Sequence, residues 1–149
     1  MPMKSCGTCG KIVPMNHVCS IKVREQSIRD SKREDKKIYW SSKWRKLRAD
    51  ILEDCECICL WSMYVEGVIR ESTVCHHIVE VIVDDSKAYD KDNVIALNYD
   101  IHRYTIHDEL YKIDKTETMR VLLECKRLWS EGVRTEGLGM LRDRVKNIK

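Results

Sequence analysis

Four of the five histidines in this 149-residue chain fall within one stretch of 33 residues. Two of them, His76 and His77, are adjacent beside a β-branched run, and Asn93 opens a second such run. His102 follows shortly after, at a position where a helix can begin. Two such runs joined by a polar loop predict a hairpin, and the segment that follows predicts a helix packed on it. This stretch constrains the fold more than any other part of the chain.

The two adjacent histidines cannot have the same role, because neighbouring side chains of a strand point to opposite faces. One of them can bind a metal ion while the other reaches a water molecule on the far side of a phosphate. His102, at the helix start, could be a second ligand of an ion bound by His76. Two neutral imidazoles leave other coordination positions of a divalent ion open for phosphate oxygens and water. Asn93 lies where a turn enters a strand, so its amide can bond to the backbone and hold the loop.

This pattern resembles that of the HNH endonucleases, also called His-Me finger or ββα-metal nucleases. The matching residues are His76, His77, Ile78, Asp90, Asn93, Val94 and His102. The segment from Tyr39 to Arg48 resembles the lead-in of small bacteriophage HNH proteins that are encoded near packaging genes. The resemblance therefore covers residues 38 to 110.

The resemblance implies an α+β fold, with a small ββα-metal core and flanking helices. It implies that His77 is the general base, that Asn93 keeps His77 in register, and that His76 and His102 bind a divalent ion such as Mg²⁺ or Mn²⁺. Some relatives carry a further histidine four residues after the last motif histidine. His107 lies five residues after His102, so we hold it only as a candidate ligand.

The chain lacks a structural zinc site that many relatives carry. Asn98 and Ile101 occupy the positions of the second cysteine pair of that site. The remaining cysteines nearby are Cys55, Cys57, Cys59 and Cys75. We expect an extended segment from Cys55 to Leu60, where a strand would space alternate thiols too far apart to share one ion easily. Buried or free thiols are the favoured interpretation, with a metal site that includes Cys75 as the alternative.

A second metal-binding pattern lies at the N-terminus. Its candidate ligands are Cys6, Cys9, His17 and Cys19, and glycines flank the first pair. A tight turn needs that backbone freedom to direct two thiolates at one ion. Because few apolar residues lie nearby, a structural Zn²⁺ that contributes on the order of 10 to 16 kcal/mol would have to order the segment. We predict a zinc knuckle, which either helps to grip DNA or is a purely structural element.

Basic residues are concentrated in the segment that follows. Between Ser20 and Ala49 there are eleven basic and four acidic residues, although the whole chain carries only +3. This excess favours contact with phosphate groups, although a solvated linker would show the same composition. Lys43, Arg45 and Arg48 are the candidate DNA-binding residues.

Two helices are predicted outside the hairpin. Trp40, Trp44, Leu47 and Ile51 recur at helical spacing and predict the core face of the first. Asp114 and Glu117 form a capping-box arrangement that predicts the start of the second, which ends at Gly132. The first strand of the hairpin and its continuation are expected over 72–83, and Asp90 is expected to cap the turn before Asn93.

Length and composition suit one modest domain with appendages. We divide the chain into a zinc knuckle (1–20), a basic linker or helix (21–38), an HNH nuclease core (39–112) and C-terminal helices (113–149). No run approaches the 18 or more apolar residues of a membrane helix, and the start lacks the apolar region of a signal peptide. We therefore expect no membrane contact and a location in the cytoplasm of a bacterial host cell.

These features together favour a metal-dependent endonuclease that hydrolyses DNA phosphodiester bonds, by nicking or by double-strand cleavage. The resemblance points to phage DNA processing or packaging, with terminase or other packaging proteins as further partners. The alternative is a non-catalytic, zinc-containing protein that binds DNA or a packaging partner. In a third interpretation, the histidine pair forms a structural zinc site with Cys75 or Cys59.

Overall fold

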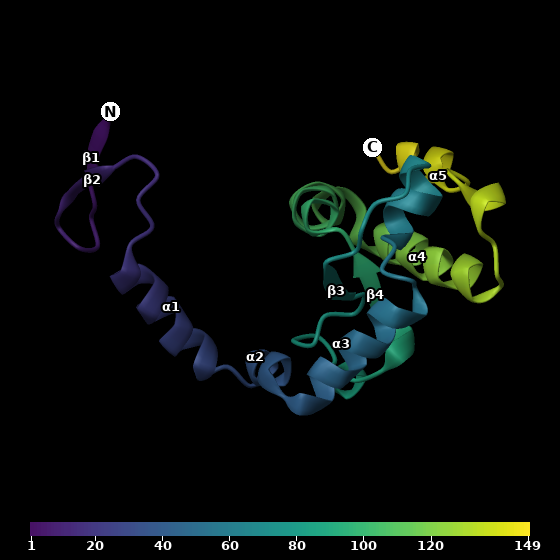
Figure 1. The fold of residues 1–149 in the computed structure, drawn as a ribbon, viewed down its shortest axis with the longest axis horizontal. Helices are drawn as coiled ribbons and strands as arrows, with labels where there is room; N and C mark the ends of the chain where they lie inside the picture. Colours follow the sequence, from purple (N-terminus) through teal and green to yellow (C-terminus); the bar gives the residue numbers. More distant parts are fainter. The chain divides into compact units, whose positions relative to one another are not determined.

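The computed structural model describes residues 1–149 and divides them into two compact units, Met1–Ser41 and Ser42–Lys149. Figure 1 shows the ribbon of both units, coloured along the sequence. Each unit has its own two-stranded antiparallel sheet. The second unit contains the histidine-rich stretch, and its arrangement positions the candidate site.

The first unit begins with a hairpin. Strand β1 (Met3–Ser5) pairs with β2 (Ile12–Pro14), and Gly10 adopts a φ of 70° in the turn between them. Only glycine reaches this left-handed conformation at little cost, which explains its place in the turn. The hairpin is followed by α1 (Ser20–Ser31), α2 (Glu34–Lys37) and the short 3₁₀-helix η1 (Ile38–Trp40). Helix α1 buries none of its residues.

The second unit is built around the hairpin of β3 (Val74–His77) and β4 (Val94–Leu97). The register places His76 opposite Ile95 and His77 opposite Val94. All four residues of β4 are buried, as expected for a strand covered on both faces. Helix α3 (Ser42–Asp54) packs against both strands (Figure 1).

Strand β3 is shorter than the predicted 72–83. It ends at His77 because the side chain of Asn93 then takes the place of a partner strand. The backbone N–H of Val79 donates to Asn93 Oδ1 at 2.8 Å, and Asn93 Nδ2 donates to the Val79 carbonyl at 2.9 Å. The loop continues through two 3₁₀-helices, η3 (Asp85–Lys87) and η4 (Lys91–Asn93). As expected, Asp90 caps the second one, accepting from the backbone N–H of Asp92 at 2.9 Å.

The predicted helix face before the hairpin is only partly correct. Trp44 and Ile51 are buried on α3, but Trp40 is 56% exposed and lies outside that helix. The reason is that Ser41 adopts an extended conformation, with φ −72° and ψ 150°, which ends η1 before α3 begins. Trp40 therefore does not share the helical periodicity of Trp44.

The prediction of an extended segment from Cys55 to Leu60 is wrong. Glu56 and Cys57 both have positive φ, 54° and 56°, and form a left-handed turn after α3. The turn is closed by backbone bonds, including one from Cys57 N to Leu52 O at 2.8 Å. The chain then enters the short helix η2 (Ser62–Glu66), which ends at Gly67 with a φ of 76°.

Two consecutive helical elements follow β4. The first is the π-helix η5 (Ile101–Leu110), and the second is α4 (Tyr111–Ser130). Asp114 has non-helical dihedral angles, and its Oδ1 accepts from the N–H of Glu117 at 2.9 Å. The predicted cap is therefore confirmed, inside a helix that begins three residues earlier. Val121, Leu122, Cys125 and Leu128 form the buried face of α4.

The C-terminal segment packs back onto the core of the second unit. It contains the 3₁₀-helix η6 (Thr135–Gly137) and α5 (Arg142–Lys146). Leu141 N donates to the carbonyl of Tyr64 at 2.8 Å, and the Tyr64 hydroxyl donates to the Val133 carbonyl at 2.6 Å.

The structure confirms the α+β class, with small sheets and flanking helices. Every helix is too short or too polar to cross a lipid bilayer.

Candidate metal centre and active site

Three histidines converge in the second unit. One ring nitrogen from each of His76, His102 and His107 lies within 4.8 Å of the other two. His102 Nε2 and His107 Nε2 are 3.2 Å apart, and the ring centroids of the three residues lie 4.7 to 5.1 Å from one another. His76 is 4% exposed, whereas the other two rings are half-buried. The cluster therefore has a closed side at the strand and a more open side at the helix.

The π-helix explains why His107 joins the cluster. Residues five apart on an α-helix differ by about 140° around the axis, which would turn His107 away from His102. In a π-helix the hydrogen bonds run from residue i to i+5, so residues five apart lie close to the same side. The winding of η5 thus brings both rings to face His76 on β3.

The environment keeps the three imidazoles neutral. Burial lowers the pKa of His76 well below its usual 6.5, and the neighbouring His102 and His107 lower it further. Burial, followed by the proximity of His107, lowers the pKa of His102 to about 4. Burial also lowers the pKa of His107. Neutral imidazoles expose a nitrogen lone pair, so the donor set fits a divalent transition ion.

His77 faces the opposite side of the hairpin. Its Nε2 lies 2.8 Å from the carbonyl oxygen of Ala88, and its ring stacks on Trp44 with centroids 4.6 Å apart and planes inclined by 23°. A carbonyl can only accept, so the bond assigns the proton to Nε2 and leaves Nδ1 as the basic nitrogen. Burial lowers the pKa of His77, and the bond to Ala88 offsets part of that effect.

Asn93 holds the loop that supplies the partner of His77. Besides its two bonds to Val79, its Nδ2 lies 3.3 Å from the carbonyl of Lys87, the residue before Ala88. Asn93 is 5% exposed, so these bonds have little competition from water. The single side chain therefore connects the end of β3 to the residues that orient the His77 ring.

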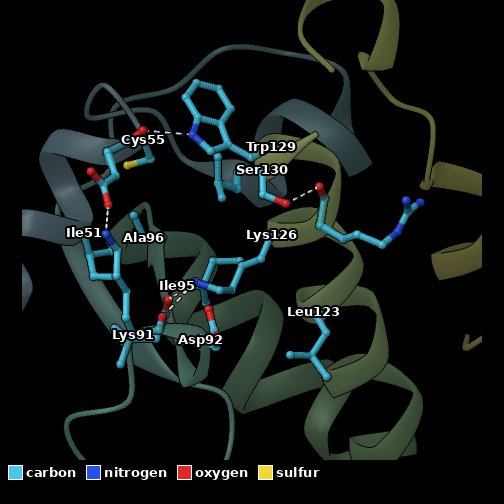
Figure 2. Close-up of a pocket in the computed structure, with 14 residues that line it drawn as sticks. Ile51, Cys55, Lys91, Asp92, Ile95, Ala96, Leu123, Lys126, Trp129 and Ser130 are labelled. Atoms are coloured by element: carbon cyan, nitrogen blue, oxygen red, sulfur yellow. Dashed lines mark hydrogen bonds and ion pairs between the residues drawn. The ribbon is translucent and has the colours of Figure 1, made fainter. Parts of the chain in front are cut away.

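Lys126 on α4 supports the same loop from outside. Its Nζ donates to the carbonyls of Lys91 at 3.0 Å and Val94 at 2.7 Å, on the two sides of Asn93. Burial lowers the pKa of this lysine. Figure 2 shows both bonds at the edge of a pocket of about 610 Å³ between α3, β4 and α4.

This pocket contains no histidine, and all of its charged side chains except Asp92 have a hydrogen-bond or ion-pair partner. Lys91 pairs with Asp54, and Arg127 pairs with Glu124 and Glu131 (Figure 2 shows the first of these pairs). The indole Nε1 of Trp129 donates to the carbonyl of Asp54 at 2.9 Å. The pocket is therefore separate from the histidine cluster, and the exposed Asp92 is its one charged side chain without a hydrogen-bond or ion-pair partner.

The N-terminal pattern also forms a cluster. The candidate ligand atoms of Cys6, Cys9, His17 and Cys19 lie within 4.8 Å of one another, and Cys9 Sγ is 3.9 Å from His17 Nε2. Hydrogen bonds from the backbone of Cys9 and of Thr8 lower the pKa of Cys6 from 9.0 to about 6. A thiolate at neutral pH is the form that binds metal, so the cluster suits zinc.

The other five cysteines do not gather around a metal site, and Cys75 among them is half-buried. Cys55, Cys59 and Cys125 are buried, whereas Cys57 is exposed. Neither Cys59 nor Cys75 belongs to the histidine cluster, contrary to the third interpretation of the sequence. The structure therefore favours the interpretation of buried or free thiols.

The candidate DNA-binding residues all lie on α3. Arg45 is exposed, whereas Arg48 donates to the carbonyl of Thr73 at 2.8 Å and so connects α3 to the residue before β3. The ammonium of Lys43 lies 4.3 Å from the ring centroid of Tyr89. Of these three residues, Arg45 is therefore the one whose side chain has no contact that would compete with a phosphate.

Sequence reasoning missed three contacts of the site. The carbonyl of Ala88 carries no sequence signal, because any residue could supply it. Trp44 was assigned to packing, and its stack on His77 adds a second role. The hydroxyl of Tyr111 lies 2.8 Å from His76 Nε2, and no sequence pattern marks this tyrosine as a partner of the histidines.

No protein-family model matches the chain, and no curated protein matches its sequence. Among solved structures, the chain is similar to the crystal structure of the HNH endonuclease of the deep-sea thermophilic bacteriophage GVE2 with a manganese ion. The two chains are 24% identical, the match covers 61% of this chain and 90% of the other, and the TM-score is 0.47.

Proposed function

We propose that this protein is a metal-dependent endonuclease that hydrolyses phosphodiester bonds in DNA. The observation that carries the proposal is that two adjacent histidines of β3 face different groups on opposite sides of the strand. His76 faces His102 and His107 on one side, and His77 faces Ala88 and Trp44 on the other. A metal centre and a separate, oriented base on adjacent residues are the two components that phosphodiester hydrolysis requires.

The histidine cluster would hold the divalent ion. When bound there, the ion supplies positive charge that stabilises the phosphate and the leaving oxygen. Mg²⁺, Mn²⁺ or a related ion would serve, as the sequence resemblance implies. Because the three imidazoles are neutral above the acid range, the protein contributes lone pairs without a charge of its own.

His77 would remove a proton from the attacking water. The bond from its Nε2 to Ala88 places the lone pair on Nδ1, and the lowered pKa keeps that nitrogen unprotonated at neutral pH. Trp44 fixes the plane of the ring, and Asn93 fixes the loop that carries Ala88. These contacts prepare the base before substrate binds, which lowers the cost of reaching the reactive geometry.

DNA is the proposed substrate because of where the charge lies. Met1–Ser41 has nine basic and four acidic residues, whereas Ser42–Lys149 has eighteen and twenty. The first unit is therefore +5 and the second −2. Attraction to a phosphate backbone would come mainly from the first unit, where zinc at the Cys6 cluster would order the hairpin. Arg45 is the candidate in the second unit for a contact near the cut.

The biological setting is also a proposal. The resemblance of the segment from Tyr39 to Arg48 to small phage nucleases points to DNA processing or packaging in a bacterial host cell. Terminase or another packaging protein would then direct where the cut is made.

The direct test is conversion of supercoiled plasmid by the purified full-length chain, with EDTA, Mg²⁺, Mn²⁺ and Ni²⁺ in parallel. We expect nicked or linear product with at least one of the ions and none with EDTA. Folded protein that binds DNA but gives no product with any ion would contradict the proposal. That result would favour the non-catalytic DNA-binding or packaging role.

A further inference from the structure

The phenolic hydroxyl of Tyr111 makes a direct contact with the histidine cluster. Its Oη lies 2.8 Å from His76 Nε2, and the ring centroid of Tyr111 is 5.7 Å from that of His76 and 5.2 Å from that of His107. Tyr111 is the first residue of α4, directly after the π-helix that carries His102 and His107. The tyrosine therefore comes from the same side of the cluster as the two helical histidines.

The chemistry of imidazole gives this contact a consequence. A neutral ring has one N–H donor and one acceptor nitrogen, so only one nitrogen is available to a metal. The hydroxyl oxygen of Tyr111 can accept a hydrogen bond from a protonated Nε2 of His76, which leaves the lone pair on Nδ1. At 4% exposure, His76 has almost no water to provide the same bond. Histidine ligands commonly depend on such an outer partner for their orientation.

Neighbouring residues hold Tyr111 in place. The ammonium of Lys115 lies 5.2 Å from the centroid of the Tyr111 ring and pairs with Glu80 at 2.8 Å. Glu80 belongs to the loop after β3, so this pair connects that loop to the first turns of α4 around the tyrosine. The Tyr111 ring thus has supports from both elements that meet at the cluster.

We propose that Tyr111 is a positioning residue of the metal centre, which holds the His76 imidazole through Nε2 so that Nδ1 is the nitrogen offered to the ion. The proposal rests on the metal site of the proposed function. It assigns to the tyrosine no contact with the ion itself. It also distinguishes His76 from His102 and His107, whose Nε2 atoms face each other.

The test is the variant Tyr111→Phe, which keeps the ring and removes only the hydroxyl. The full-length chain is first loaded with one equivalent of Zn²⁺ to fill the N-terminal cluster, and Ni²⁺ binding is then measured by calorimetry without DNA. We expect Ni²⁺ affinity to fall by about 10- to 100-fold, as for other outer partners of histidine ligands. The matched control is Tyr104→Phe, on the preceding helix η5 at 60% exposure, which should leave the affinity unchanged.

Two results would overturn the proposal. One is unchanged Ni²⁺ affinity in a Tyr111→Phe protein whose metal-free unfolding temperature equals that of the wild type. The other is a tyrosinate charge-transfer band in the copper-loaded wild type that is lost in the variant, because the oxygen would then be a ligand. Since binding is measured without DNA, absence of cleavage would count against the nuclease proposal and leave this one standing.

Discussion

At the residue scale, the site depends on histidines that stay neutral inside the protein. Their folded-state pKa values lie below the usual 6.5, well below it for His76 and at about 4 for His102, because burial disfavours the charged form. The unfolded chain then binds more protons than the folded chain whenever the pH is below the usual value. The same burial that prepares ligands for a metal thus makes the metal-free protein sensitive to acid.

This sensitivity gives a pH prediction. The stability contributed by neutral His102 is fully present above pH 6.5 and is lost as the pH falls toward about 4. In EDTA, the thermal unfolding temperature of the wild type should therefore decline across this window. His102→Asn, which cannot take up a proton, should show a shallower decline. Identical pH profiles for the two proteins would contradict the assignment.

The sequence predicts the residues of the site better than their contacts. The adjacent pair His76 and His77 could be placed on opposite faces from strand geometry alone, and the side chain of Asn93 bonds to the loop backbone as expected. The carbonyl of Ala88 and the hydroxyl of Tyr111 could not be predicted, because neither contact has a sequence pattern. Both depend on where distant backbone segments come to lie.

At the element scale, the winding of η5 decides whether His107 belongs to the site. Sequence periodicity assumes α-helical turns, in which His107 would point away from His102. The π-helix cannot be predicted from that periodicity, although it places the two Nε2 atoms 3.2 Å apart. Likewise, the strand prediction over 72–83 rests on the β-branched residues there. Such a pattern contains no sign that the side chain of Asn93 replaces a partner strand after His77.

The bonds from Lys126 on α4 to the loop around Asn93 lead to a prediction for this lysine. Lys126→Met keeps the apolar stem and leaves the carbonyls of Lys91 and Val94 without their charged donor. We expect the free energy of unfolding, measured with urea, to fall by about 1 to 3 kcal/mol. Plasmid cleavage should also fall, because the loop around Asn93 loses its outer support.

A surface lysine provides the control for this variant. Lys146→Met removes an exposed ammonium on α5 that pairs with Asp143 within the same helix. Such a pair contributes little, so stability and cleavage should both stay near wild type. If the two lysine variants behaved alike, the supporting role of Lys126 would be rejected.

At the scale of the whole molecule, the two units differ in net charge and in the candidate metal-binding cluster that each contains. Met1–Ser41 carries the net positive charge and the cysteine cluster, whereas Ser42–Lys149 carries the histidine cluster and a net charge of −2. Binding of DNA should therefore depend on the first unit and cutting on the second. The basic excess was visible in the sequence, but the acidic balance of the core appears only once the unit boundary is known.

This division predicts how salt affects binding. In the double variant Lys22→Gln and Arg24→Gln, on α1, the slope of log affinity for DNA against log salt should fall by about 2, roughly 1 per lost phosphate contact. The control variant Lys112→Gln and Lys146→Gln removes the same charge from the second unit and should change the slope much less. Equal changes in the two proteins, measured by fluorescence anisotropy, would show that the first unit does not supply the phosphate contacts.

The central claim is that His77 is the base that acts beside a metal held by His76, His102 and His107. The measurement that tests it most directly is plasmid cleavage by His77→Ala and His77→Gln, with metal content and DNA affinity determined on the same preparations. We predict that both variants keep their bound metal and their DNA affinity and lose cleavage by about 10²- to 10⁴-fold. Cleavage near the wild-type rate in either folded variant would contradict the account.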